Sequence, residues 1–303
     1  MKSLLFSVRV RLYAIMLGMI ALPLLLTSCG GEGAAAEETQ TSGKIAVSTS
    51  WLECCLRDLA GAELDLLRVC PPGTCPGHFD IRPGAAAELH SCRMLFLFDF
   101  QQSLGEKLQT FAPDEFDAVP VAIPGGLCVP SSYLQGCEAV QAALSKAYPE
   151  NEAAYKTALD GVRERIARLE DEVQQQIQTA GLKGAKVMAS GHQEKFCRWL
   201  GLEPVAMYSG PDTASPAQIE ALLQKGKASG VQFVIANQQE GAQAGEALAH
   251  QLNAPLVVFS NFPSMSGGET TFDALVRANV ANLLKAVESR NERKEQNDRA
   301  DAP

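Results

Sequence analysis

Residues 69–83 read Val-Cys-Pro-Pro-Gly-Thr-Cys-Pro-Gly-His-Phe-Asp-Ile-Arg-Pro and lie between an expected strand and an expected helix. The apolar run 64–69 has the length of a short strand, and Pro83 suits the first turn of a helix. A loop so rich in proline is stiff, and stiff loops that follow strands often hold ligands in α/β proteins. His78 is therefore a candidate ligand, although a surface turn with an idle histidine would look the same.

Short apolar or β-branched runs alternate with helix-like segments on both sides of this loop. We expect strands within the residue ranges 44–50, 64–69, 94–98, 118–123, 186–190, 204–208, 231–236 and 255–260. Strands that are separated by helices form parallel βαβ units. The sequence thus predicts an α/β fold with two Rossmann-like parallel-sheet lobes, residues 44–148 and 182–288.

One long helix is expected between the two lobes, over residues 149–181. Its apolar residues recur at steps of three and four, which is the period of an amphipathic helix; they are Tyr155, Leu159, Val162, Ile166, Leu169, Val173 and Ile177. Gly181 is well placed to end this helix, because glycine favours the position just after a helix. A last helix is predicted over 271–287, followed by a disordered tail, 289–303.

The first 28 residues have the pattern of a lipoprotein signal peptide. A positively charged start precedes the apolar run 12–26, which is short for a membrane span. The tetrapeptide Leu26-Thr27-Ser28-Cys29 matches a bacterial lipobox, so we expect cleavage before Cys29 and lipidation of its thiol. Residues 29–43 would then be a flexible tether, and the protein would be extracytoplasmic, lipid-anchored to a bacterial membrane.

Charge and cysteine content narrow the possible partners. The formal net charge is −9, so a basic nucleic-acid footprint is absent and no nucleic-acid partner is expected.

Eight further cysteines in an exported chain suggest disulfides, and the pairs closest in sequence within loops are Cys70–Cys75 and Cys128–Cys137. The connectivity stays open, and a zinc knuckle built on Cys70, Cys75 and His78 is a less favoured alternative.

Three motifs in this order resemble a known family. They are residues 72–83, the sequence Pro149-Glu-Asn-Glu-Ala-Ala-Tyr, and the sequence Ser215-Pro-Ala-Gln-Ile. Together they resemble the zinc- and manganese-binding solute-binding lipoproteins of ABC importers. The resemblance implies a zinc or manganese ion as cargo, no organic cofactor, a permease and an ATPase as partners, a monomer, and no enzymatic activity.

The resemblance also implies a ligand set of three histidines and one carboxylate, which this chain keeps only in part. His78 matches the first histidine, whereas Ser131, Ser190 and Ser260 stand at the other three ligand positions. His192 follows Ser190 by two residues and could replace it as a ligand. Since serine hydroxyls are poor zinc ligands, three serines would not hold a divalent metal tightly.

Other residues could complete the site or change its ligand. Asp80 or Glu194 could supply a carboxylate beside a core of His78 and His192. Alternatively, the serines and Asn237 suit a larger hydrogen-bonding solute or a metal complex. An exported cysteine-rich redox or metal-handling protein and an adhesin-like protein also stay open, although no Cys-x-x-Cys motif supports thioredoxin-like chemistry.

Overall fold

The computed structural model describes residues 44–72, 74, 83–113, 116–210 and 215–300. The candidate residues Cys29, Cys75, His78 and Asp80 lie outside these ranges. Within the described residues, the strands form two four-stranded sheets, and every strand pair in them is parallel. None of the described helices is long and apolar enough to cross a membrane.

The first sheet has the strand order β2-β1-β3-β4. Its strands are β1 (Lys44–Val47), β2 (Leu66–Arg68), β3 (Cys92–Phe98) and β4 (Asp117–Val121). Strand β3 is buried at every position except Arg93, as expected for a strand covered on both faces of a parallel sheet.

The second sheet repeats this topology with the order β6-β5-β7-β8. Its strands are β5 (Lys186–Ser190), β6 (Glu203–Tyr208), β7 (Phe233–Asn237) and β8 (Leu256–Phe259). Two parallel sheets of like topology confirm the predicted α/β fold of two lobes.

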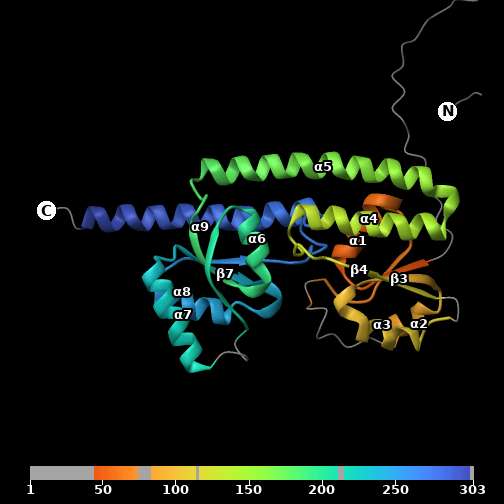
Figure 1. The fold of residues 1–303 in the computed structure, drawn as a ribbon, viewed down its shortest axis with the longest axis horizontal. Helices are drawn as coiled ribbons and strands as arrows, with labels where there is room; N and C mark the ends of the chain where they lie inside the picture. Colours follow the sequence, from red (N-terminus) through yellow and green to blue (C-terminus); the bar gives the residue numbers. More distant parts are fainter. Residues whose placement is uncertain (1–43, 73, 75–82, 114–115, 211–214, 301–303) are drawn as a thin grey trace, which may run out of the picture. The chain divides into compact units, whose positions relative to one another are not determined.

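Helices flank both sheets (Figure 1). They are α1 (Ser50–Ala60), α2 (Pro83–Leu89), α3 (Gln102–Gln109), α4 (Pro130–Ala147), α6 (Glu194–Trp199), α7 (Pro216–Ser229), α8 (Gln243–Leu252) and α9 (Phe272–Ala300). Short 3-10 turns are η1 (Asp99–Gln101), η2 (Pro149–Asn151), η3 (Gly191–Gln193) and η4 (Gln238–Glu240). Helix α7 begins after a cap at Ser215, whose hydroxyl accepts from the backbone N–H of Gln218 while the Gln218 side chain accepts from the Ser215 N–H.

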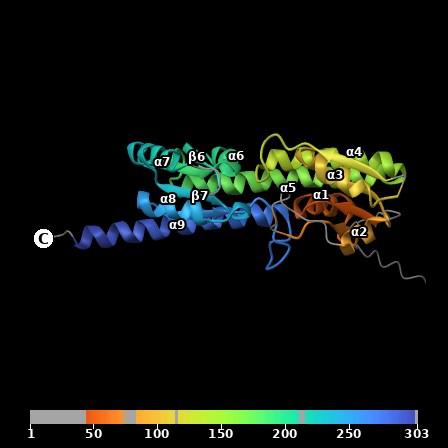
Figure 2. The ribbon, with the colours of Figure 1, turned by 90° about the horizontal axis from the view of Figure 1, so that it is seen from below.

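The predicted long helix is α5 (Glu152–Thr179), whose 28 residues span about 42 Å. It passes from α4 to the second lobe in both views (Figure 1 and Figure 2). Its seven predicted apolar positions are all buried. The helix ends as predicted, because Gly181 adopts a φ of 63° and the N–H of Leu182 bonds to the carbonyl of Ile177 at 3.1 Å.

Two parts of the secondary structure differ from the sequence prediction. Helix α4 was not predicted; Pro130 occupies its first turn, where the missing N–H of proline costs no helical bond. Helix α9 continues to Ala300, so the predicted helix end at Val287 is wrong, and residues 289–300 of the predicted disordered tail are helical instead. Residues 289–300 contain neither glycine nor proline, and the Arg290 guanidinium donates to Gln232 at 2.7 Å and lies over the Phe233 ring.

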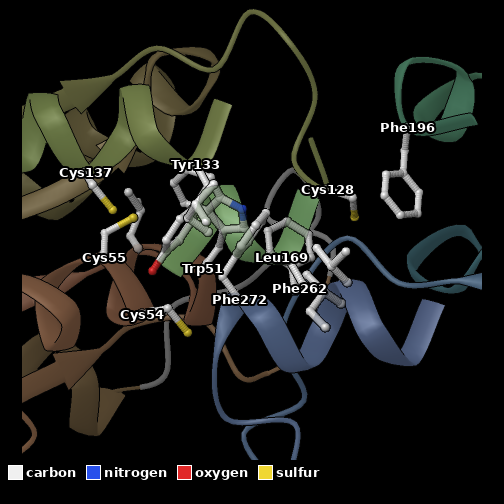
Figure 3. Close-up of a cluster of buried hydrophobic side chains, with 14 of the residues drawn as sticks. Trp51, Cys54, Cys55, Cys128, Tyr133, Cys137, Leu169, Phe196, Phe262 and Phe272 are labelled. Atoms are coloured by element: carbon white, nitrogen blue, oxygen red, sulfur yellow. The ribbon is translucent and has the colours of Figure 1, made fainter. Parts of the chain in front are cut away.

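Helix α5 and aromatic side chains join the two lobes in one continuous core cluster. The Tyr133 ring of α4 stacks on Phe272 of α9, with centroids 4.0 Å apart, and Trp51 of α1 meets Phe272 edge-to-face (Figure 3). Next to this cluster, Arg165 of α5 bonds to both Asp58 of α1 and Asp273 of α9. These contacts favour a rigid connection between the lobes over a free hinge.

Candidate metal-binding site

Polar residues of the second lobe gather where its adjacent parallel strands end. Ser190 ends β5, Asn237 ends β7, and Ser260 follows β8. Strands β5 and β7 are neighbours although β6 lies between them in sequence, so the strand order reverses at this point. Ligands of open α/β sheets bind in the crevice outside such a reversal. The candidate residues Ser190 and Asn237 lie at this reversal.

The Glu240 carboxylate and the His192 imidazole meet at this point, and the Ser190 hydroxyl contacts both the Glu240 side chain and the backbone of His192. Ser190 Oγ donates to Glu240 Oε2 at 2.5 Å and accepts from the backbone N–H of His192 at 3.3 Å. His192 Nε2 lies 3.4 Å from Glu240 Oε1. The His192 side chain is 63% exposed and that of Glu240 is 22% exposed, so an ion could reach both.

These two side chains have the chemistry of divalent-metal ligands. Imidazole nitrogen and carboxylate oxygen are ligands that zinc accepts, and manganese also favours carboxylates. Because Ser190 holds one oxygen of Glu240, the other oxygen, Oε1, faces the His192 ring. An ion that replaced the contact between His192 and Glu240 would find both ligands already positioned.

Buried amides hold the surrounding loops in place. Gln193, which is fully buried, donates from Nε2 to Asn237 Oδ1 at 3.1 Å and to Asn261 Oδ1 at 2.9 Å. Gln239 donates to Ser260 Oγ at 3.0 Å and accepts from the backbone N–H of Asn261 at 2.9 Å. The Asn237 and Ser260 side chains therefore already have protein partners, which suits a role in positioning better than direct metal binding.

Cys128 connects the first lobe to this network. Its thiol donates to the backbone carbonyl of Ser260 at 3.0 Å, and the Asn279 amide donates to its sulfur at 3.6 Å. Burial raises the pKa of this thiol well above its ordinary value. The predicted Cys128–Cys137 disulfide does not match this structure, because the Cys128 sulfur contacts Ser260 and Asn279 whereas Cys137 lies beside Cys55 (Figure 3). The Cys70–Cys75 pair lies partly outside the described residues.

Other predicted site residues are not brought together with His192 and Glu240 by any described contact. Ser131 is exposed in the first turn of α4. Glu194 begins α6 and accepts two hydrogen bonds from Arg198, at 2.9 and 3.0 Å. Within the described residues, no group of three or more histidine, cysteine, aspartate or glutamate side chains could hold a metal ion.

Sequence reasoning missed Glu240, although a signal was available. Asn237 is a candidate because its amide suits a hydrogen-bonding solute, and Glu240 lies three residues farther along the chain, after the same predicted strand. Two pockets of the described surface line the edge strands β4 and β8, and no residue of the candidate site borders either of them.

Two α/β lobes of the same topology, joined by one long helix and carrying polar loops at the strand ends, define a two-lobed solute-binding protein. Residues 129–286 match the family described as zinc-uptake complex component A, periplasmic (ZnuA). The match covers more than half of the chain, so the chain belongs to this family and is a solute-binding component of a metal ABC importer.

Solved structures share the fold at low sequence identity. The crystal structure of ZnuA has a TM-score of 0.70 and 17% identity, and covers 82% of this chain and 100% of that chain. A manganese-bound mutant of a periplasmic metal binding protein from Candidatus Liberibacter asiaticus has a TM-score of 0.70 and 13% identity, with coverages of 81% and 99%. The cadmium-bound form of that protein has the same scores and coverages. A search of curated protein sequences found no match.

Proposed function

We propose that this protein captures a zinc or manganese ion outside the cytoplasm and delivers it to the permease of an ABC importer, powered by the partner ATPase. The observation that carries the proposal is the contact of Ser190, Glu240 and His192 at the strand-order reversal of a ZnuA-family lobe. Solved structures of this fold are described as manganese-bound and cadmium-bound. The protein acts by binding and release, and is not an enzyme.

The proposed ligand set takes residues from both lobes. His192 and Glu240 supply an imidazole and a carboxylate from the second lobe. His78 supplies the second imidazole from the proline-rich segment of the first lobe, a role that rests on its sequence motif. Asp80, two residues later in the sequence, is a further candidate carboxylate. Ser190 orients Glu240 through its hydrogen bond and is not itself a ligand.

The proposed cellular setting rests on the sequence of the first 43 residues. Cleavage before Cys29 and lipidation of its thiol would anchor a monomer to the outer side of a bacterial membrane. Residues 30–43 would let the folded part reach the permease. This lipid anchor rests on the lipobox sequence, and metabolic labelling with a fatty acid, lost in Cys29→Ala, would test it.

The ligand set is tested by calorimetric titration of the metal-free protein with zinc and with manganese. Glu240→Gln keeps the shape of the side chain but removes its charge, and His192→Ala and His78→Ala each remove an imidazole. We expect each substitution to lower the affinity for the more tightly bound metal ion at least about tenfold, because few ligands remain. Ser190→Ala should weaken it by about tenfold through the lost orientation of Glu240.

Matched controls lie on the exposed surface of helix α8. Glu246→Gln and His250→Ala make the same chemical changes away from the site and should leave the affinity unchanged. Equal affinity in wild type and Glu240→Gln would exclude Glu240 from the ligand set. Failure of the wild-type protein to bind either ion at micromolar concentration would contradict the proposed function itself.

A further inference from the structure

Helices α1 and α4 pack with a register that brings two cysteines together. Trp51 and Cys55 are four residues apart on α1, and Tyr133 and Cys137 are four residues apart on α4, so each pair shares one face of its helix. The Trp51 and Tyr133 rings meet edge-to-face with centroids 5.2 Å apart. One turn farther along both helices, Cys55 therefore faces Cys137.

The two thiols are in contact inside the core. Both side chains are fully buried, and the proximity of Cys137 adds to burial in raising the pKa of Cys55. Figure 3 shows their sulfur atoms pointing toward one another, whereas the sulfur of Cys54 lies apart from them. Cys54 instead donates to the backbone carbonyl of Thr270 at 3.5 Å. Of the two adjacent cysteines of α1, Cys55 is thus the one that can react with Cys137.

We propose that Cys55 and Cys137 form a disulfide bond in the exported protein. An extracytoplasmic chain folds in an oxidising environment, where buried thiols in contact are oxidised during folding. Two Sγ–H bonds break and one Sγ–Sγ bond forms. The two protons pass to solvent, and the two electrons reduce the disulfide of a dithiol oxidase or of a small-molecule oxidant such as oxidised glutathione.

This disulfide would have a structural consequence for the first lobe. It closes a loop from Cys55 to Cys137, and this loop contains strands β2, β3 and β4. The loop also contains the proline-rich segment with His78. Since a crosslink restricts the unfolded chain most when the loop is long, the bond would stabilise the lobe that carries the proposed first ligand.

The disulfide is tested on the full chain, exported by its own signal peptide or refolded with reduced and oxidised glutathione. The protein is denatured without reductant, alkylated, digested and mapped by mass spectrometry. We expect the peptides of Cys55 and Cys137 to be recovered joined, with a mass two daltons below the sum of the free peptides. Cys197, which is buried in the second lobe, should be recovered alkylated and serves as the internal control.

Because Cys54 and Cys55 are adjacent, single substitutions show which of the two sulfur atoms forms the bond with Cys137. The crosslink should persist in Cys54→Ala and disappear in Cys55→Ala. A reductant should lower the unfolding temperature of the wild type and of Cys54→Ala, and leave that of Cys55→Ala unchanged. Recovery of Cys55 and Cys137 as alkylated thiols from the oxidised wild type would overturn the proposal, and this result does not require any variant to fold.

Discussion

Arg165 is the residue whose removal should weaken the connection between the lobes most. Its guanidinium bonds to Asp58 of α1 and Asp273 of α9, and the Tyr133 hydroxyl donates to Asp58 at 2.5 Å. The Asp58 and Asp273 side chains are only 22% and 7% exposed. Arg165→Met keeps most of the side-chain volume but leaves two largely buried carboxylates without their cation.

The expected loss of stability can be estimated from this burial. Breaking a buried ion pair by removing one partner costs about 3–5 kcal/mol, and the remaining exposure of Asp58 favours the lower end. For a domain of this size, about 3 kcal/mol corresponds to a fall of about 6–12 °C in the unfolding temperature. Differential scanning calorimetry at pH 7.5 measures this shift.

The loss should also depend on pH. Burial raises the pKa of the Asp58 carboxyl, and Arg165 opposes that rise. Without Arg165 the pKa of Asp58 rises further, so the folded state holds its proton to a higher pH than the unfolded state does. The stability linked to this proton is present at low pH and is lost as the pH rises through the folded pKa. Arg165→Met should therefore lose less stability at pH 5 than at pH 7.5.

Arg163→Met is the matched control on the same helix. Arg163 also contacts two carboxylates, Asp160 at 2.7 Å and Glu138 at 2.8 Å, but all three side chains are well exposed. Exposed ion pairs contribute about 0–1 kcal/mol, so this substitution should change the unfolding temperature little. A loss in Arg165→Met no larger than that in Arg163→Met would refute the argument from burial.

Three other predictions test packing, pH dependence and thiol burial. Gly136→Ala should destabilise the fold by about 1–3 kcal/mol, because its new Cβ would lie 2.5 Å from the Trp51 ring, whereas Gly161→Ala has open space and should be neutral or stabilising in the same thermal melts. The hydrogen bond from Arg277 lowers the pKa of Glu172. The small stabilisation from this pair is therefore present above the ordinary carboxyl pKa and is lost as the pH falls through the pKa of Glu172 in the folded protein. Glu172→Gln should remove that part of the acid sensitivity in pH-dependent melts. Burial raises the pKa of the thiols of Cys54, Cys128 and Cys197. These thiols should therefore resist a thiol reagent at pH 8 until the protein is denatured. Rapid labelling of the native protein would contradict their burial.

Local sequence patterns predicted most of the elements but misjudged two segments. Helix α4 was missed because its apolar positions are interrupted by small and polar residues, including Gly136, whose missing side chain makes room for Trp51. Helix α9 extends past the point where its apolar residues stop, because strong helix formers continue it and Arg290 contacts the second lobe. In both cases packing decided what local composition left open.

The sequence by itself determined the two α/β lobes, the buried face of the linker helix and its end at Gly181, since these depend on the spacing of apolar residues and on glycine conformation. Only the tertiary structure decided which distant residues meet. His192 meets Glu240 because β5 pairs with β7 and not only with β6, and Cys137 meets Cys55 because α1 packs on α4. Strand order and helix register depend on the burial of whole faces of sheets and helices, so a short stretch of sequence does not predict them.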